Sequence, residues 1–137
     1  MDCIFCKIIA RGEVPSTQVY EDREVYAFLD INPVNLGHTL VVPKKHYKTL
    51  FEIPDGELGT LGVCVKKIAS AVKTALSADG INVSMNNGSA AGQIVHHAHI
   101  HIIPRHEKDG FKHWQGRRGY INDEEKEKTA AKIKSAL

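Results

Sequence analysis

Three histidines alternate with apolar residues in one short segment, and this pattern restricts the fold more than any other feature of the chain. The segment reads His97-Ala98-His99-Ile100-His101-Ile102-Ile103. Successive side chains of a β-strand point to opposite faces, so the alternation predicts a half-buried strand. The imidazoles would share one face at a spacing of about 7 Å, and the apolar residues between them would anchor the other face in a core. Imidazoles in a row on a rigid strand are suited to proton transfer, nucleophilic attack or metal binding near neutral pH.

The rest of the chain predicts an α+β fold with a mostly antiparallel five-stranded sheet, one long helix and a C-terminal helix. The expected strands are Gln18–Glu21, Val25–Leu29, Thr39–Val42, Ile81–Met85 and the histidine segment, which Pro104 would close. Apolar residues recur at three- and four-residue steps from Leu58 to Val72, which is typical of an amphipathic helix. Asn122 followed by Glu125 is typical of a helix start. Residues 3–9 are apolar and predict a short helical turn.

Length and composition are those of one ordinary domain. The chain has 137 residues, 42% of them hydrophobic and 25% charged, so we expect a single domain over residues 1–137. The net charge of +2 and the lack of a long basic run argue against a nucleic-acid partner. The sequence has no secretory signal pattern and no apolar run of membrane-spanning length, so we expect a cytoplasmic protein without a membrane partner.

The segment between the histidines and the C-terminal helix is rich in glycine and charge, and we expect residues 105–120 to be irregular. Basic side chains are scattered through it: His106, Lys108, Lys112, His113, Arg117 and Arg118. The simplest interpretation is a solvated surface. The alternatives are attraction of polyphosphate or nucleic acid, or a contact with the site of a partner subunit.

The three histidines could be ordinary surface or core residues, metal ligands or catalytic groups. Two alternate histidines on a strand can chelate one ion, but the outer pair would lie about 13 Å apart at Cα, so all three cannot easily share one. Nucleophilic catalysis suits the row better, because a central imidazole can attack through one nitrogen while an acceptor holds the other. Just upstream, the small residues of the segment 86–93 predict a phosphate-binding loop, or else a plain connection.

The stretch from Gly92 to Arg105 resembles the motif of the histidine-triad (HIT) family, His-φ-His-φ-His-φ-φ, where φ is apolar. The resemblance continues at residues 3–9, 27–31, 37–38 and 43–46, in the order that the family shows. It therefore covers a core of about 3–105 and leaves out the tail and helix at 106–137. The cysteine pair in this core is similar to that of the zinc-binding, Hint-like members of bacteria and archaea.

The resemblance implies a HIT-like fold, a homodimer that joins two sheets, and cleavage of purine nucleotide conjugates at the α-phosphate. The substrates would be phosphoramidates or dinucleoside polyphosphates, and the central histidine would form a nucleotidyl intermediate that water hydrolyses. By matching position, His99 is the nucleophile and Asp30 accepts the ribose hydroxyls. The full catalytic set is His97, His99, His101 and Gln93. The nucleotide-binding set is Phe28, Asp30, Ile31, His38, Asn86, Gly92 and Gln93, with Phe28 and Ile31 at the base.

One position departs from the phosphoramidate-hydrolase branch of the family. That branch carries a hydroxyl residue after the glutamine, whereas this chain has Ile94, which offers no hydrogen bond. The ending Ile103-Pro104-Arg105 is shared with the dinucleoside-polyphosphate branch. The leaving group is therefore open at this point.

Cys3 and Cys6 supply half of a tetrahedral zinc site, or else they are two buried apolar residues on a short helical turn. His46, after a strand end, and His97 are the best candidates for the other two ligands. Family members with the cysteine pair are similar in this respect, so we predict one structural zinc ion per chain. If His97 binds the metal, it cannot also donate a proton.

Three functions compete. The first is a hydrolase that uses His99 as its nucleophile. The second is a nucleotide-binding regulatory or interaction module with little turnover. The third is a zinc protein whose histidines are all ligands, and the geometric limit on three imidazoles at one ion argues against it.

Overall fold

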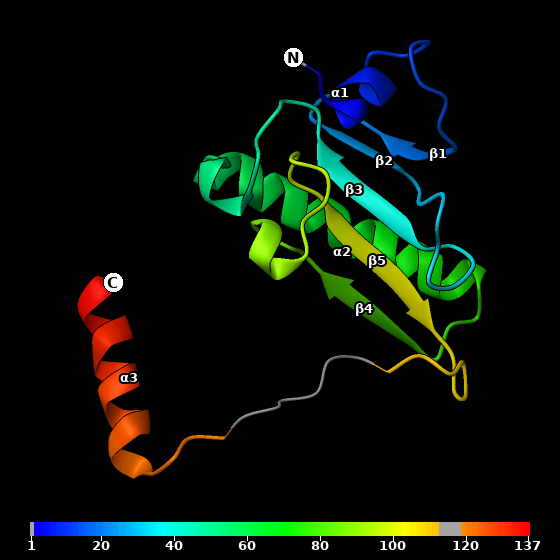
Figure 1. Ribbon diagram of the computed structural model, residues 1–137. Helices are drawn as coiled ribbons and strands as arrows, with labels where there is room; N and C mark the ends of the chain where they lie inside the picture. The colour runs from blue at the N-terminus through cyan, green and yellow to red at the C-terminus, as the bar shows by residue number, and fades with distance from the viewer. Residues whose placement is uncertain (1, 113–118) are drawn as a thin grey trace.

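A computed structural model describes residues 2–112 and 119–137. The elements, in chain order, are α1 (Ile4–Ile9), β1 (Gln18–Glu21), β2 (Val25–Leu29), β3 (Thr39–Pro43), the 3-10 turn η1 (Leu50–Glu52), α2 (Asp55–Ala75), β4 (Gly80–Ser84), η2 (Ser89–Ala91), β5 (Ile100–Arg105) and α3 (Asp123–Ala136). The strands form one sheet in the order β1-β2-β3-β5-β4, and each pairs antiparallel with its neighbour. The α+β class, the five strands and both expected helices are thus confirmed (Figure 1).

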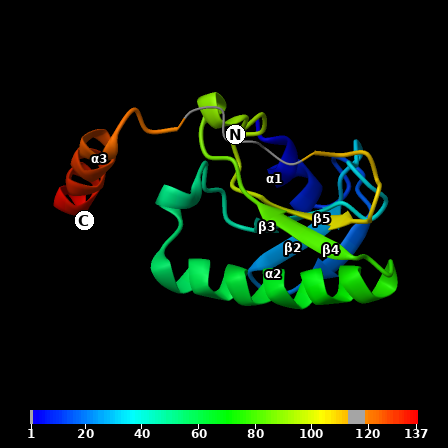
Figure 2. The ribbon, with the colours of Figure 1, turned by 90° about the horizontal axis from the view of Figure 1, so that it is seen from below.

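Two apolar cores cover the two faces of the sheet (Figure 2). Alternate residues of β2 and β3 divide between them, because neighbouring side chains on a strand point to opposite faces. Val25, Ala27 and Val41 pack towards α2. The residues between them pack with α1: Tyr26, Phe28, Leu40 and Val42. Every residue of β3 is buried, which explains its unbroken apolar sequence.

α2 covers one face along its whole length, as the apolar periodicity predicted (Figure 2). Its buried residues recur at three- and four-residue steps, so they form one stripe. They are Leu61, Cys64, Val65, Ile68 and Val72. The opposite face of the sheet packs against α1 and against Val14 and Val95, which lie in loops.

The histidine segment is not a continuous strand, and this expectation was wrong. β5 begins at Ile100, so His97 and His99 precede it, and Pro104 lies inside the strand rather than closing it. The reason lies in the hydrogen-bond partners of the segment. β3 pairs only with residues 100–102, whereas the Ala98 N–H donates to the Tyr47 carbonyl in the loop after β3. A proline at 104 does not interrupt that short ladder. The alternation of faces still holds, because Ala98 and Ile102 are fully buried in the α2 core.

The C-terminal helix begins where the sequence predicted. The Asn122 side chain accepts a hydrogen bond of 2.8 Å from the Glu125 N–H and caps α3. No residue of α3 is buried, and the helix stands apart from the sheet in both views (Figures 1 and 2). Of the basic tail residues, His113, Arg117 and Arg118 lie outside the described residues. No described helix has the length and apolar character needed to cross a bilayer.

The core beneath the histidines sets a first prediction. Ile102 is fully buried in β5, so Ile102→Ala should lower the free energy of unfolding by about 2–5 kcal/mol, through lost transfer energy and a cavity. Val63 on α2 is 72% exposed, and Val63→Ala should change stability by less than about 0.5 kcal/mol. Urea denaturation of both variants measures the difference. Equal effects would contradict the assignment of Ile102 to the core.

Candidate functional site

A cavity of about 490 Å³ lies on the α1 side of the sheet, next to the histidine segment. Its walls come from α1, the end of β2, the loop that leads to the histidines, and the start of β5. Seven of the residues that were predicted to bind the nucleotide or to take part in catalysis line this cavity. They are Phe28, Asp30, Ile31, Asn86, Gly92, His99 and His101. The fold thus brings three separated motifs of the sequence to one cavity.

The apolar wall that α1 contributes to this cavity was not predicted from the sequence. Ile4, Phe5 and Ile8 line the cavity, and Val14 extends this wall. The rings of Phe5 and Phe28 meet edge to face with their centroids 5.3 Å apart. The only signal in the sequence was an apolar helix of six residues, which is too short to form a core layer of its own.

His99 has one ring nitrogen engaged and one free. Its Nδ1 lies 2.6 Å from the carbonyl oxygen of His97, which can only accept a hydrogen bond. Nδ1 therefore carries the proton, and Nε2 keeps its lone pair. Burial lowers the pKa of His99, which favours the neutral ring that a nucleophile requires.

His101 is held in the opposite tautomer through His38. The Val34 N–H donates to Nδ1 of His38 at 3.0 Å, so the proton of a neutral His38 is on Nε2. That Nε2 lies 2.9 Å from Nδ1 of His101 and donates to it. His101 consequently carries its own proton on Nε2, where it can serve as a donor. Burial, with His99 and His38 nearby, lowers the pKa of His101 to about 4.

Asp30 lies beside this histidine pair at the end of β2. Its Oδ2 is 3.6 Å from Nε2 of His38, and its Oδ1 accepts a hydrogen bond from the Asn32 N–H. The carboxylate lines the cavity and its side chain is 19% exposed, so its remaining lone pairs can accept hydroxyl groups. Asp30, His38 and His101 also lie close enough to hold a metal ion, but the two imidazoles already bond to each other.

Gln93 does not line the cavity. Its amide oxygen accepts from the Gly88 N–H, and its amide nitrogen donates to the carbonyls of Lys48 and Val95. The side chain is 4% exposed, so it ties the loop before the histidines to the loop after β3. A direct contact between Gln93 and the phosphate stays a prediction, because in this geometry the amide is fully engaged within the protein.

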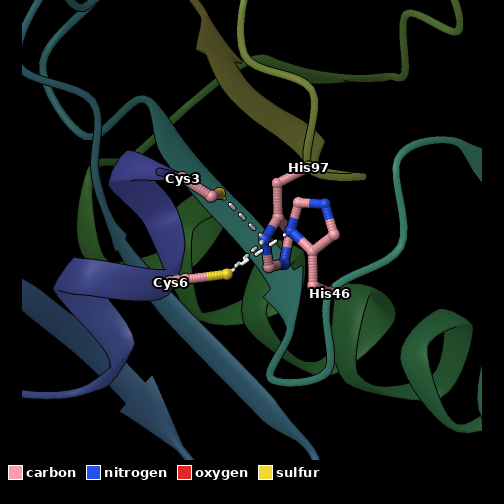
Figure 3. Close-up of side chains that lie close together, drawn as sticks. All are labelled: Cys3, Cys6, His46 and His97. Carbon is pink, nitrogen blue, oxygen red and sulfur yellow. Dashed lines mark hydrogen bonds between the residues drawn. The ribbon is translucent and has the colours of Figure 1, made fainter. Parts of the chain in front are cut away.

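His97 faces away from the cavity and towards the two cysteines of α1 (Figure 3). Its Nε2 donates to the Pro43 carbonyl at 2.8 Å, which leaves the lone pair of Nδ1 free. That Nδ1 lies 3.5 Å from Sγ of Cys3 and 3.6 Å from Sγ of Cys6. Nδ1 of His46 lies 3.4 Å from Sγ of Cys6. One ligand atom from each of the four residues lies within 4.8 Å of all the others.

This quartet has the donors and spacing of a structural zinc site. Zn–S bonds of about 2.3 Å and Zn–N bonds of about 2.0–2.1 Å place the sulfur and nitrogen ligands of a tetrahedral ion about 3.5–3.6 Å apart. The three sulfur–nitrogen distances of the quartet are 3.4, 3.5 and 3.6 Å. Two thiolates and two imidazoles would fill all four positions of such an ion and leave none open for substrate.

Comparison with known proteins now gives the family. A family model described as the HIT domain matches residues 11–108, which is more than half of the chain. This protein therefore belongs to the HIT-domain family.

Its relatives include characterised and uncharacterised proteins. An uncharacterized HIT-like protein of Methanocaldococcus jannaschii is 59% identical over 108 residues, which cover 79% of this chain and 82% of that one. A protein of Arabidopsis thaliana named as an adenylylsulfatase is 48% identical over 108 residues, 79% of this chain but 54% of its own length. A Candida albicans protein named as an adenosine 5′-monophosphoramidase is 43% identical over 107 residues, 75% of this chain and 70% of that protein.

Solved structures show the same fold. A HIT-family protein of Bacillus subtilis is 44% identical, with a TM-score of 0.91 over 100% of this chain and 98% of that one. A histidine-triad protein of Mycobacterium smegmatis, described as zinc-bound, is 34% identical, with a TM-score of 0.77 over 100% of this chain and 99% of that one.

The environment of His101 sets a prediction for stability. The pKa of His101 is lowered from 6.5 to about 4, so between these pH values the unfolded chain binds more protons than the folded chain. Stability is therefore lost as the pH falls from about 6.5 towards about 4. In thermal denaturation at pH about 7.5 and about 5, we expect a smaller loss for His101→Gln than for the wild type. His106→Gln, a histidine outside the cavity, should keep the wild-type loss, and an unchanged loss in His101→Gln would contradict the prediction.

Proposed function

We propose that this protein hydrolyses purine nucleotide conjugates at the α-phosphate, with His99 as the nucleophile. The observation that carries the proposal is the free Nε2 lone pair of His99 beside a cavity that also holds the donor His101 and the carboxylate of Asp30. The names of the Arabidopsis and Candida relatives, a sulfatase and a phosphoramidase of adenylyl compounds, agree with this chemistry.

The reaction has two displacements at phosphorus. Nε2 of His99 forms a bond to the α-phosphorus as the bond to the leaving group breaks, and the leaving group departs with the electron pair and takes a proton from water. The Nε2–H of His101 donates to the phosphoryl oxygen or to the leaving atom. Water then attacks the phosphorus, the P–N bond breaks, and His99 is regenerated with release of the nucleoside monophosphate. The carbonyl of His97 stabilises the positive charge on the ring while the intermediate exists.

The cavity divides into regions that suit the parts of a nucleotide. The apolar wall with Phe28 and Ile31 takes the base, and Asp30 accepts the ribose hydroxyls. Asn86 and Gly92, from the loop before the histidines, lie where the phosphate would bind. With the nucleotide bound in this way, the α-phosphorus would lie at the histidine end of the cavity.

The first test is substitution of the nucleophile. His99→Ala should lower kcat for adenosine 5′-phosphoramidate or diadenosine polyphosphate by at least about 100-fold, because no other group offers the lone pair. It should still bind AMP in calorimetry. His106→Ala is the matched control and should retain wild-type turnover.

Two results would decide against the proposed mechanism. Covalent label trapped on any residue other than His99 would overturn the assignment of the nucleophile. Wild-type protein that binds AMP but turns over no phosphoramidate or dinucleoside polyphosphate would favour the nucleotide-binding regulatory module instead.

We also propose that the quartet of Cys3, Cys6, His46 and His97 holds one structural zinc ion per chain. The support is the donor set, the tetrahedral spacing, and the tautomer of His97, whose free nitrogen points at the thiols. The zinc would fix α1 against the loop after β3, and so stabilise one wall of the nucleotide cavity. His97 is then a metal ligand rather than a proton donor.

Metal analysis and denaturation test the zinc site. Purified protein should contain about one zinc per chain, and Cys6→Ser should lose the metal and unfold at a lower temperature, because metal binding is coupled to folding. Cys64→Ser is the control, since Cys64 lies in α2 and its thiol contacts Asp22 rather than the quartet. Wild-type protein with far less than one zinc, and no change in unfolding temperature with a chelator, would refute the proposal.

The homodimer and the cytoplasmic location stay predictions. β4 forms one edge of the sheet, so its outer backbone groups are open to pairing with a second copy, as the family resemblance implies. Val83 on β4 is 52% exposed in the single chain, which is consistent with such a contact.

A further inference from the structure

A second cavity, of about 410 Å³, adjoins the nucleotide cavity. Its walls come from the start of the chain, the loop after β3 and the segment just before His97. Ile4, Ile94 and Val95 line both cavities, so the two spaces meet at these side chains. Cys3 and His46 of the proposed zinc quartet form part of its wall, but the space itself has no role in the functions described above.

The second cavity combines an apolar wall with one uncompensated positive charge. Lys48 lines it and forms no ion pair with any residue among 2–112 and 119–137. The only carboxylate in the lining is Asp2, which is already paired with Lys7. His46 and His96 complete the polar part of the lining.

The residue at the junction is Ile94, which is 89% exposed. It directly follows Gln93, whose amide anchors this loop to the Lys48 carbonyl. A branched apolar side chain at this position cannot donate a hydrogen bond to the leaving group. It can pack against a hydrocarbon chain of that group. Substrate that extends past the phosphate across Ile94 therefore enters the cavity that Lys48 also lines.

We propose that the second cavity binds the leaving group, and that it favours organic leaving groups with an apolar body and an anionic end. The proposal rests on the proposed function, since it concerns the group that the reaction releases. A second nucleotide joined by several phosphates fits this cavity poorly. A single lysine cannot neutralise the charges of several phosphates, and the apolar wall offers no hydrogen bonds to the polar groups of the nucleotide. The cavity thus selects conjugates of a nucleoside monophosphate with an organic acid-bearing amine.

The test compares two conjugates of nearly equal size. One is AMP joined through a P–N bond to 6-aminohexanoate, and the other is the same compound with a carboxamide in place of the carboxylate. Wild-type protein should prefer the carboxylate in kcat/KM by about two- to fivefold, which is the range of a solvent-exposed ion pair. In Lys48→Met the ratio should fall to about one, because the methylene stem remains and the charge is removed. Lys73→Met, an unpaired lysine on the exposed face of α2, should keep the wild-type ratio.

A second variant tests the apolar part. Wild-type protein should hydrolyse the hexylamine conjugate of AMP with higher kcat/KM than the methylamine conjugate, and Ile94→Ala should reduce that preference severalfold. An unchanged preference would remove Ile94 from the leaving-group site.

Binding measurements separate this inference from the proposed function. Calorimetry with His99→Ala and with His99→Ala/Lys48→Met gives the dissociation constants of both 6-aminohexanoate conjugates without turnover. A carboxylate preference that depends on Lys48, without hydrolysis by the wild type, would support the cavity and refute the hydrolase. Hydrolysis of the conjugates with no charge preference, or with one that survives Lys48→Met, would support the hydrolase and overturn the assignment of the second cavity. Absence of both hydrolysis and preference would overturn both.

Discussion

The chemistry of this site depends on the hydrogen-bond partner that engages one ring nitrogen of each histidine in the triad. His97 donates through Nε2 to the Pro43 carbonyl, and His99 donates through Nδ1 to the carbonyl of His97. His101 accepts at Nδ1 from His38. Each partner fixes a tautomer and leaves the other nitrogen for a different task. Three identical side chains are therefore suited to the three different roles proposed for them: metal ligand, nucleophile and hydrogen-bond donor.

α1 connects the metal site with the nucleotide cavity. Cys3 and Cys6 flank Phe5, whose ring contacts the rings of both His97 and His99 with centroids 5.9 and 5.1 Å away. The helix is only six residues long, so its propensity alone cannot hold it in place. Packing on β2 and β3 positions it, and bonds from the cysteines to the proposed zinc ion would hold it further. Loss of the metal would consequently disturb the cavity wall as well as the stability of the fold.

Much of the fold was predictable because it follows from local patterns. The short apolar run Val25–Leu29 predicted a strand, and the three- and four-residue steps from Leu58 to Val72 predicted the buried face of α2; both elements lie where expected. β5 was predicted three residues too early, since the Ala98 N–H bonds to the Tyr47 carbonyl instead of to β3, and no pattern in the histidine segment reports that distant partner. The role of Gln93 as an anchor between two loops was equally hidden, because all three of its partners are backbone groups.

The amino-acid sequence by itself determined the family motif and the two faces of the histidine segment, because both follow from residue type and spacing along the chain. The quartet of Cys3, Cys6, His46 and His97 was expected from the cysteine spacing together with the family resemblance. Only the tertiary structure decided which nitrogen of each histidine is free, that α1 forms a wall of the nucleotide cavity, and that a second cavity with Lys48 adjoins it. The reason is that carbonyl partners, ring contacts and cavities arise between segments far apart in the chain, and only the packed sheet brings those segments together.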